Sequence, residues 1–397
     1  MGTSIYISSA IGASIGFIAW HPMFSGMPWV TLALLVFLPA AWVLAGSRLA
    51  AFALFLAYYA AFARDVHAAF TRFFPDEWTG WGYGLWLLHA AFLALPWAIF
   101  WKKEWSARAI AVRLSIVFAI LLLPPVALFN WGHPLLAAGA LFPGTGIAGL
   151  AGCAIFGYSI ALWAIGDARG RNGAADLALA SFLVNMLYVP PTPPAGWQAI
   201  NTTMGRYPIE NFNRRFTWQQ ELIRKVDSAI TSGARVIVLP EEIAGEWKPS
   251  HSFWWKSTEK KAKKNGSTVL IGADLRSGKV FSDAVLALGK DSGVVLTARV
   301  PMPIGNWQFW NPGKSTATNI FDSGVRKVDG KKTAFSICYE DFLIWTHFEW
   351  MIDKPDVLVS MVNDWSVSGL AAQWHQTLSI ESQARLGRVP LVRASND

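Results

Sequence analysis

The chain is short of charge and of cysteine. Charged residues make up 15% of its 397 residues, hydrophobic residues make up 53%, and the mean hydropathy is +0.33. A composition this apolar excludes an ordinary soluble protein. The 2 cysteines, Cys153 in an apolar stretch and Cys338 in the polar half, also exclude a disulfide-rich scaffold.

The charged residues that are present concentrate after about residue 200, so the chain divides into an apolar half and a polar half. Stretches long enough, or nearly long enough, to cross a bilayer lie at residues 4–20, 28–46, 48–64, 82–101, 109–129, 135–165 and 175–190. We therefore predict an N-terminal polytopic α-helical membrane bundle at residues 1–190, with about seven crossings. A globular domain is expected at residues 191–397.

Loop charge indicates the orientation of these helices. With a cytoplasmic N-terminus, the inner loops hold most of the basic residues, among them Arg48, Lys102 and Arg169. This arrangement is favoured because cytoplasmic loops are enriched in Lys and Arg. Residues 191–397 of a bacterial inner-membrane protein would then lie in the periplasm. The net charge of +8 is spread out rather than gathered with aromatic residues, so we expect no direct binding of nucleic acid.

The polar half alternates predicted strands and helices. Helices are expected at residues 213–232, 253–264 and 371–386, and strands at 197–203, 235–239, 268–273, 283–288, 294–300, 333–337, 356–361 and 389–393. Several strands are joined by turns of hairpin length, as at residues 289–293. The pattern therefore predicts a mixed, layered α/β fold rather than a doubly wound parallel sheet.

Two of the predicted strands end on reactive side chains. The strand at 235–239 leads into Glu241 and Glu242, and the strand at 333–337 leads into Cys338, followed by Tyr339 and Glu340. A thiol needs a base within reach because it is mostly protonated at neutral pH, so Cys338 is a candidate nucleophile. The alternative is that Cys338 is a small buried apolar residue, as many free cysteines are.

Four motifs, in a fixed order, resemble the carbon–nitrogen hydrolase (nitrilase) superfamily. They are Leu239-Pro-Glu-Glu, Ser336-Ile-Cys-Tyr-Glu-Asp, Val362-Asn-Asp-Trp-Ser and the run from Ser382 to Asn396. The resemblance implies a nitrilase-like α-β-β-α domain. The membrane half in front of it looks like apolipoprotein N-acyltransferase. The shorter build and the run Arg299–Trp307 look more like the TraB group of conjugal transfer proteins, which are acyltransferase-like.

Carried over motif by motif, the resemblance makes Glu241 the general base, Cys338 the nucleophile and Glu340 a supporting carboxylate. Glu242 is left as an exposed or helix-capping acid, since only one of two adjacent side chains at a strand end points at the thiol. The physical reasoning agrees, because a glutamate in a closed apolar pocket has its pKa raised into the range useful for a base.

The sequence departs from the family at three places. Ala298 stands where the family has its catalytic lysine, and Asn306 stands where a glutamate ends the following turn. The nearest cation is Arg299, which could hold an oxyanion but cannot give up a proton and take it back. The chain also stops at Asp397, where the family continues, so we expect a C-terminally truncated domain with an uncovered sheet edge.

The resemblance implies an N-acyltransferase of the carbon–nitrogen hydrolase type that serves plasmid conjugal transfer. A lipid would donate the acyl chain, Cys338 would carry it as a thioester, and an amine would accept it. The expected partners are a phospholipid or lipid-linked substrate, the membrane, and a protein acceptor or a component of the conjugation machinery; no cofactor and no metal are expected. The alternatives are a non-catalytic conjugation or envelope assembly factor with a degenerate nitrilase fold and, third, an amidase.

Overall fold

The computed structural model describes residues 2–75, 79–278, 280–308, 310–311 and 315–397. The chain divides into two compact units. The first comprises Met1–Pro190, Phe342–Ile352 and Gly369–Arg388, and the second comprises Pro191–Asp341, Asp353–Ser368 and Val389–Asp397. The first division falls where the sequence predicts it, but two later segments group with the apolar unit. The domain limits 1–190 and 191–397 stay a prediction, since a grouping by contacts does not test how each part folds.

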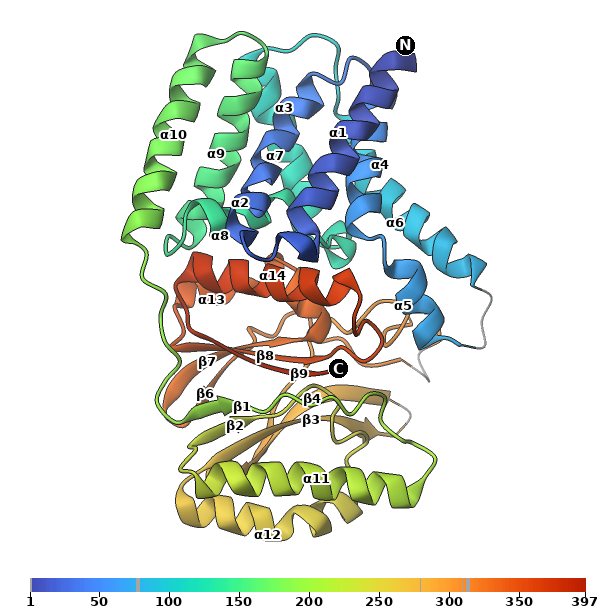
Figure 1. Ribbon diagram of the computed structural model, residues 1–397, viewed down its shortest axis with the longest axis vertical. Helices are drawn as coiled ribbons and strands as arrows, with labels where there is room; N and C mark the ends of the chain where they lie inside the picture. The colour runs from blue at the N-terminus through green and yellow to red at the C-terminus, as the bar shows by residue number, and fades with distance from the viewer. Residues whose placement is uncertain (1, 76–78, 279, 309, 312–314) are drawn as a thin grey trace. The chain divides into compact units, whose positions relative to one another are not determined.

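The first unit is helical (Figure 1). Its α-helices are α1 (Gly2–Trp20), α2 (Pro28–Ala33), α3 (Leu38–Val43), α4 (Arg48–Phe62), α5 (Val66–Phe73), α6 (Gly80–Ile99), α7 (Ala107–Leu122), α8 (Ala137–Leu141), α9 (Ile147–Ala164) and α10 (Ala168–Leu187), together with α13 (Phe348–Asp353) and α14 (Ala371–Gly387) from late in the chain. Short 3-10 turns link several of them, among them η2 (Leu34–Phe37) and η4 (Pro134–Leu136).

Three of the described helices are long and apolar enough to cross a membrane: Thr3–Trp20 in α1, Gly80–Ile99 and Ile147–Ala164. The count rises to 4 if the bent pair α4 and α5, which meet at 47°, forms a single span. The remaining expected crossings are shorter or less apolar in the structure. Seven crossings therefore stay a prediction, whereas the apolar helical character of this part of the chain is observed.

Several of the expected apolar stretches are interrupted, among them those at 28–46 and 135–165. The stretch at 28–46 is split into α2, η2 and α3, and the stretch at 135–165 is split into η4, α8 and α9. The second break lies at Pro143, which lacks a backbone donor, and at Gly144 and Gly146, whose φ values are +79° and +58°. The backbone N–H groups of these two glycines donate to carbonyls in the last turn of α14, at 2.9 and 2.8 Å. Sequence periodicity cannot register such a break because the residues that compensate it lie far along the chain.

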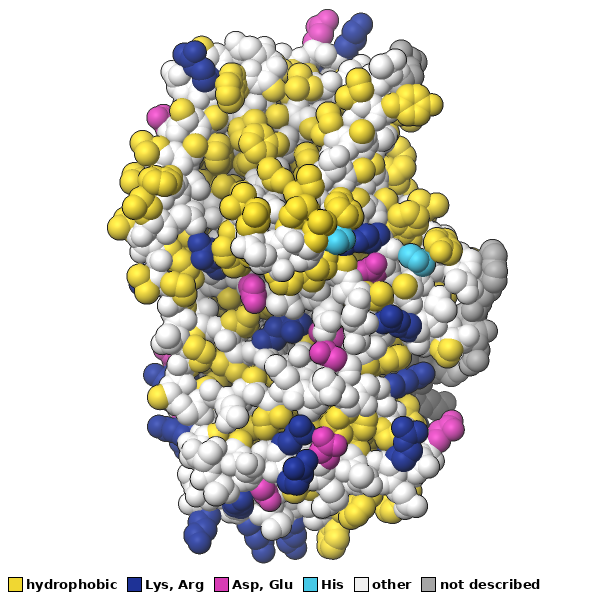
Figure 2. Space-filling model, viewed as in Figure 1, with side chains coloured by type: hydrophobic (Ala, Val, Ile, Leu, Met, Phe, Trp, Pro, Cys, Tyr) yellow, Lys and Arg dark blue, Asp and Glu magenta, His cyan; other side chains and the backbone are white. Residues whose placement is uncertain are grey.

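Hydrophobic side chains crowd the visible face of this unit over α1, α9 and α10 (Figure 2). Large exposed apolar residues on α9 and α10 include Ile155, Trp163, Leu179, Phe182 and Leu187, which is 80% exposed. A soluble surface rarely exposes so continuous an apolar face, and a lipid-facing surface does so by necessity.

Helices α1 and α4 approach closely through two glycines one helical turn apart. A Cβ added to Gly12 would lie 1.9 Å from the carbonyl oxygen of Leu54, and one added to Gly16 would lie 2.6 Å from that of Tyr58. This small-xxx-small pattern lets two helix backbones touch, which is the usual source of helix association in lipid.

The second unit holds two sheets. The first has the order β1 (Trp197–Ala199), β2 (Val236–Val238), β3 (Thr268–Ser277), β4 (Val280–Gly289), β5 (Gly293–Thr297), and the second has the order β6 (Val325–Val328), β7 (Lys331–Ile337), β8 (Val357–Asn363), β9 (Leu391–Asn396). Strands β1 to β3 and strands β7 to β9 run parallel, and β4, β5 and β6 pair antiparallel with their neighbours. The mixed α/β fold predicted for this half is therefore confirmed, and β6 is a strand that its charged sequence did not predict.

A shared core joins the inner faces of the two sheets. It includes Val238 and Val285 from the first sheet and Phe335 and Met361 from the second, all at most 1% exposed. The helices α11 (Phe212–Thr231) and α12 (Pro249–Asn265) cover the outer face of the first sheet with a second apolar cluster (Figure 1).

The edge at β9 is partly covered by the chain itself. The backbone N–H of Thr202 donates to Ser395, and that of Asp397 donates back to Thr202, so the segment after β1 lies along the end of β9. The side chain of Asn396 strengthens this contact by accepting from the Thr202 hydroxyl at 2.8 Å. The expected uncovered edge is therefore paired at this end.

We predict that Gly12→Ala strongly destabilises the helical unit, because its methyl group would collide with the carbonyl of Leu54. The cost should reach about 1–3 kcal/mol, as in other overpacked contacts. Thermal unfolding of the detergent-solubilised chain, followed by tryptophan fluorescence, measures it. The matched control is Gly84→Ala in α6, where nothing lies within 4 Å of the added Cβ. Equal unfolding midpoints for the two variants would contradict a close α1–α4 contact.

Candidate functional site

Cys338 begins the 3-10 turn that directly follows β7. Its φ is +46°, in the left-handed region that non-glycine residues rarely occupy. Such strain persists where the surrounding structure fixes a side chain in one direction, and it is common at functional sites. Cys338 as a residue is half-buried and packs against the end of the core between the two sheets.

Glu241 lies just beyond the end of β2 and is 4% exposed. Its carboxylate accepts the backbone N–H of Asn363 at 3.0 Å and is hydrogen-bonded to the thiol of Cys338. Gly272 on β3 makes this position possible, since a Cβ there would lie 2.5 Å from the Glu241 Cα. The structure thus brings together the two residues that the sequence names as base and nucleophile.

The surroundings of Glu241 and Cys338 raise the pKa values of both side chains and so favour their protonated forms. Burial raises the pKa of Glu241 well above its usual value, and Asp283 nearby raises it further. Burial and the adjacent Glu241 raise the pKa of the Cys338 thiol in the same direction. At neutral pH the thiol is therefore protonated and in contact with a carboxyl group that can take its proton.

Glu241 belongs to a cluster of acids that the sequence did not reveal. One carboxylate oxygen from each of Glu241, Glu242 and Asp283 lies within 4.8 Å of the others. Asp274 joins the cluster through a side-chain hydrogen bond to Glu242. Glu242, expected to be an exposed or helix-capping acid, instead takes part in this cluster and adopts a φ of +47°.

The sequence around Asp283 contains a pattern that could have identified it as a candidate site residue. It stands at the start of an apolar run on β4, and alternation along a strand puts it on the same face as Val285 and Ala287, which belong to the core between the sheets. An acid on the inward face of a strand is costly to bury and therefore suggests a functional site.

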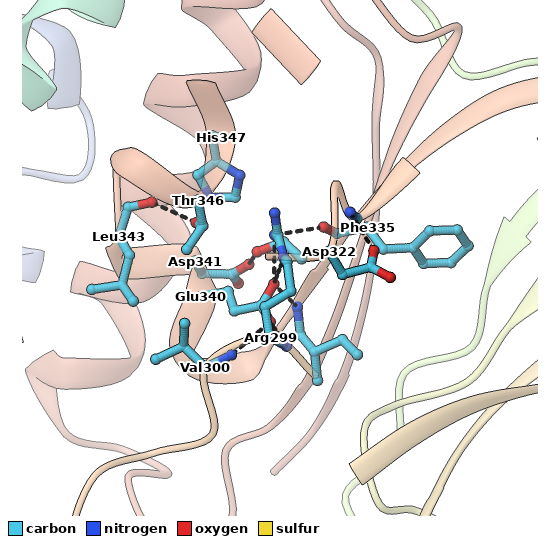
Figure 3. A network of polar contacts seen from close by, with 12 residues as sticks. Arg299, Val300, Asp322, Phe335, Glu340, Asp341, Leu343, Thr346 and His347 are labelled. Carbon is cyan, nitrogen blue, oxygen red and sulfur yellow. Dashed lines mark hydrogen bonds and ion pairs between the residues drawn. The ribbon is translucent and has the colours of Figure 1, made fainter. Parts of the chain in front are cut away.

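Arg299 and Glu340 form a second pair, buried at 2% and 0% exposure (Figure 3). The guanidinium donates to Glu340 Oε2 from Nη2 at 2.6 Å and from Nε at 3.0 Å, and Nη2 also reaches the carbonyl of Phe335. The other carboxylate oxygen accepts the backbone N–H groups of Arg299 and Val300. Glu340 therefore fastens the segment after β5 to the turn that carries Cys338. The oxyanion role foreseen for Arg299 stays a prediction.

Ala298 and Asn306, the two positions where a lysine and a glutamate were expected, also lie beside the acids. The backbone N–H of Ala298, at the expected lysine position, donates to the carbonyl of Asp283 at 2.8 Å. Asn306, in place of a glutamate, directs its amide toward Glu242 Oε1 at 3.4 Å. Among the residues that the structure describes, no ion pair links a Lys or Arg to Glu241, Glu242, Asp274 or Asp283.

Known proteins of similar sequence are conjugal transfer proteins. The chain is 28% identical over 370 residues to the probable conjugal transfer protein TraB of Sinorhizobium fredii, covering 90% of each chain. It is 28% identical over an alignment of 409 residues to the conjugal transfer protein TraB of Agrobacterium fabrum, covering 99% of this chain and 92% of that protein. The predicted resemblance to the TraB group is confirmed at this level. No protein-family model matches the chain.

Solved structures that resemble part of the chain are carbon–nitrogen hydrolases. An amidase from Nesterenkonia sp. is 10% identical with a TM-score of 0.36, covering 50% of this chain and 75% of its own. A carbon–nitrogen hydrolase from Helicobacter pylori is also 10% identical, with a TM-score of 0.37, and covers 50% of this chain and 73% of its own.

We predict that Arg299→Lys destabilises the second unit, because a lysine cannot reproduce the forked contact with buried Glu340. Arg299→Ala should cost more, about 3–5 kcal/mol, since it leaves a buried carboxylate without a partner. Thermal unfolding in detergent measures both.

The matched control is Lys263→Ala, which breaks an ion pair of the same 2.6 Å length to Glu259. That pair is exposed and lies one helical turn apart, so its loss should cost only about 0.5 kcal/mol. If Arg299→Ala costs no more than this control, the buried pair does not hold the segment after β5 in place.

Proposed function

We propose that the chain is a conjugation-associated, membrane-anchored, nitrilase-like acyltransferase that uses Cys338 as its nucleophile. The single observation that carries the proposal is the buried hydrogen bond between the thiol of Cys338 and the carboxylate of Glu241. The two residues lie about 100 positions apart in the chain, at the ends of strands from different sheets. Cys338 has a φ of +46°, and the place of Glu241 requires glycine at position 272.

In the proposed reaction Glu241 takes the thiol proton and the Cys338 sulfur attacks the carbonyl carbon of a lipid ester. A carbon–sulfur bond forms, the ester carbon–oxygen bond breaks, and the leaving alcohol receives the proton from Glu241. An amine then attacks the thioester, an amide bond forms, and the thiol returns with a proton that the amine has lost. The charge that develops on the carbonyl oxygen in each step needs fixed hydrogen-bond donors, such as backbone N–H groups.

In this proposal Glu340 and Arg299 are positioning residues. Their charges neutralise each other, so Arg299 has little net field left for an oxyanion. Their contacts fix the turn at Cys338 relative to the segment that contains Ala298.

A lipid donor fits the apolar helical unit. The helices carry a continuous apolar surface, three are long and apolar enough to cross a membrane, and the relatives of similar sequence are conjugal transfer proteins. We propose a bacterial inner-membrane location with residues 191–397 on the periplasmic side, which the excess of Lys and Arg in the opposite loops supports. An amidase acting on a small soluble amide has no use for such a surface.

A second candidate function is a non-catalytic assembly factor of the conjugation apparatus. Ala298 and Asn306 favour it, because they remove the lysine and the glutamate that the family uses beside its cysteine. The second candidate and the first differ in whether Cys338 is needed.

The location is tested by fusing a periplasm-dependent reporter after residue 210 and, separately, after Lys103. We expect activity from the first fusion and none from the second, because the loop charges retain the basic segment at Lys103 in the cytoplasm. The reverse pattern would rule out a periplasmic site.

The chemistry is tested by incubating the full chain in membranes with a phospholipid that carries a labelled acyl chain. We expect a hydroxylamine-sensitive adduct on Cys338, lost in Cys338→Ala together with conjugal transfer. Cys153→Ala is the control, since Cys153 is buried within helix α9 and should have little effect. Normal transfer by a correctly inserted Cys338→Ala protein would eliminate the acyltransferase and favour the assembly factor.

A further inference from the structure

Asp283 is a buried acid at this site to which the proposed reaction assigns no role. It is 2% exposed and lies on the inward face of β4. Its backbone carbonyl accepts the N–H of Ala298, so it occupies the strand next to the position where a lysine is missing. Burying a carboxyl group without a task would only destabilise the fold.

One carboxylate oxygen of Asp283 lies within 4.8 Å of one of Glu241, and the two side chains are hydrogen-bonded. Two carboxylates in contact repel each other strongly in apolar surroundings, so one of them must carry a proton. A cation could replace that proton, but the described residues place no Lys or Arg in an ion pair with either group. A hydrogen-bonded carboxyl–carboxylate pair that shares one proton satisfies both the burial and the contact.

The hydrogen-bond donors around the two carboxyl groups differ. Glu241 accepts the N–H of Asn363 and contacts the thiol of Cys338, and donors of this kind stabilise an ionised carboxylate. Asp283 accepts from the backbone of Ala284, but its Oδ1 has no hydrogen-bond partner within the described part of the chain. Burial raises the pKa of both carboxyl groups, and their contact raises that of Glu241 further, so the two groups hold the shared proton together.

We propose that Asp283 is a positioning residue: its carboxyl group shares one proton with Glu241 and holds that side chain against Cys338, at a site where Ala298 stands at the position expected for a lysine. The inference rests on Glu241 acting on Cys338 as proposed above. It adds the group that holds Glu241 in place where none of the described Lys or Arg residues forms an ion pair with it.

The negative charges around Glu241 and Asp283 also favour a proton on this pair. Glu242 and Asp274 face the pair from the segment after β2 and from β3, and Glu340, neutralised by Arg299, faces it from the turn after β7. Burial, followed by the negative charge of Asp274, raises the pKa of Asp283 to about 8. Burial also raises the pKa of Asp274 to about 6.

Near Cys338 itself, Asp364 adds a further negative charge that raises the pKa of the thiol. Arg393 lies 3.2 Å from Asp364 and offsets part of that charge.

The proposal has a definite dependence on pH. Below the pKa of Asp283, about 8, the pair keeps its shared proton and carries one negative charge, so Glu241 can accept the proton of Cys338. Above that pH the shared proton leaves, and the two charged carboxylates repel each other. Glu241 then moves away from the thiol, or the added charge opposes formation of the thiolate. The reactivity of Cys338, relative to that of a free thiol, should therefore fall as the pH rises through this range.

The test follows alkylation of Cys338 by iodoacetamide in the full chain, purified in detergent, between pH 6 and pH 9.5. In this step the sulfur forms a bond to carbon, iodide leaves with the electron pair, and Glu241 takes the thiol proton. A Cys153→Ala background leaves Cys338 as the only thiol, and mass spectrometry of the intact protein gives the rate. Rates are divided by those of N-acetylcysteine at the same pH.

We expect the parent to lose relative reactivity above about pH 8, where the pKa of Asp283 lies. Asp283→Asn, which keeps a neutral donor of the same shape, should react at pH 7 within about threefold of the parent and should show no fall at high pH. Asp283→Ala should react at least about tenfold more slowly at pH 7, because a misplaced base loses much of its effect. The control Asp353→Asn alters an exposed acid in the same unit and should match the parent throughout.

Several outcomes would overturn the proposal. One is an Asp283→Asn profile that still falls at high pH, which would assign the titration to another group. Another is a parent profile that changes on adding EDTA or Mg²⁺, which would mean that a divalent cation rather than a proton bridges the carboxylates. If Asp283→Ala fails to fold, the Asp283→Asn profile alone decides. Because alkylation needs no acyl donor, these results stay separate from the labelled-lipid test of the proposed function.

Discussion

The second unit is governed by the cost of burying carboxylates between two apolar sheets. Each buried acid must be paired with a cation, protonated, or supplied with hydrogen-bond donors. Glu340 meets this requirement with Arg299 and with backbone N–H groups. Glu241 meets it with Asn363, with the thiol of Cys338 and, in our proposal, with a proton shared with Asp283. The difference between these two solutions separates a structural pair from a reactive one.

Asp341 shows the same constraint a little farther along the turn. It is fully buried, and it accepts hydrogen bonds from Ser336 on β7 and Ser360 on β8, at 2.5 and 2.8 Å. Arg393 of β9 lies 3.9 Å away, and burial still raises the pKa of Asp341 to about 7. Polar residues of three neighbouring strands thereby converge behind Cys338, which helps to explain how the turn keeps a strained backbone.

A different constraint applies to the helical unit. Its helices are apolar on many sides, so burial of apolar surface alone cannot select one packing arrangement. The close approach of helix backbones at glycine residues selects it instead. Gly12 and Gly16 admit α4, and Gly139 in α8 lies so close to α14 that a Cβ there would meet the carbonyl of Ser382 at 2.0 Å. Helix α14 is encoded between two strands of the second sheet, β8 and β9, yet its packing partners within this unit are apolar helices.

The sequence by itself determined the division into an apolar helical part and an α/β part, most of the strands, and the positions of Cys338 and Glu241 at strand ends. Hydropathy and periodicity are local quantities, and the motifs keep their order along the chain, so both can be read without coordinates. Only the tertiary structure decided that Arg299 forms an ion pair with Glu340, that Glu242 joins the acidic cluster, and that Asp283 contacts Glu241. These contacts join residues that lie 40 or more positions apart, and the energy of a charge depends on which other charges the fold brings beside it.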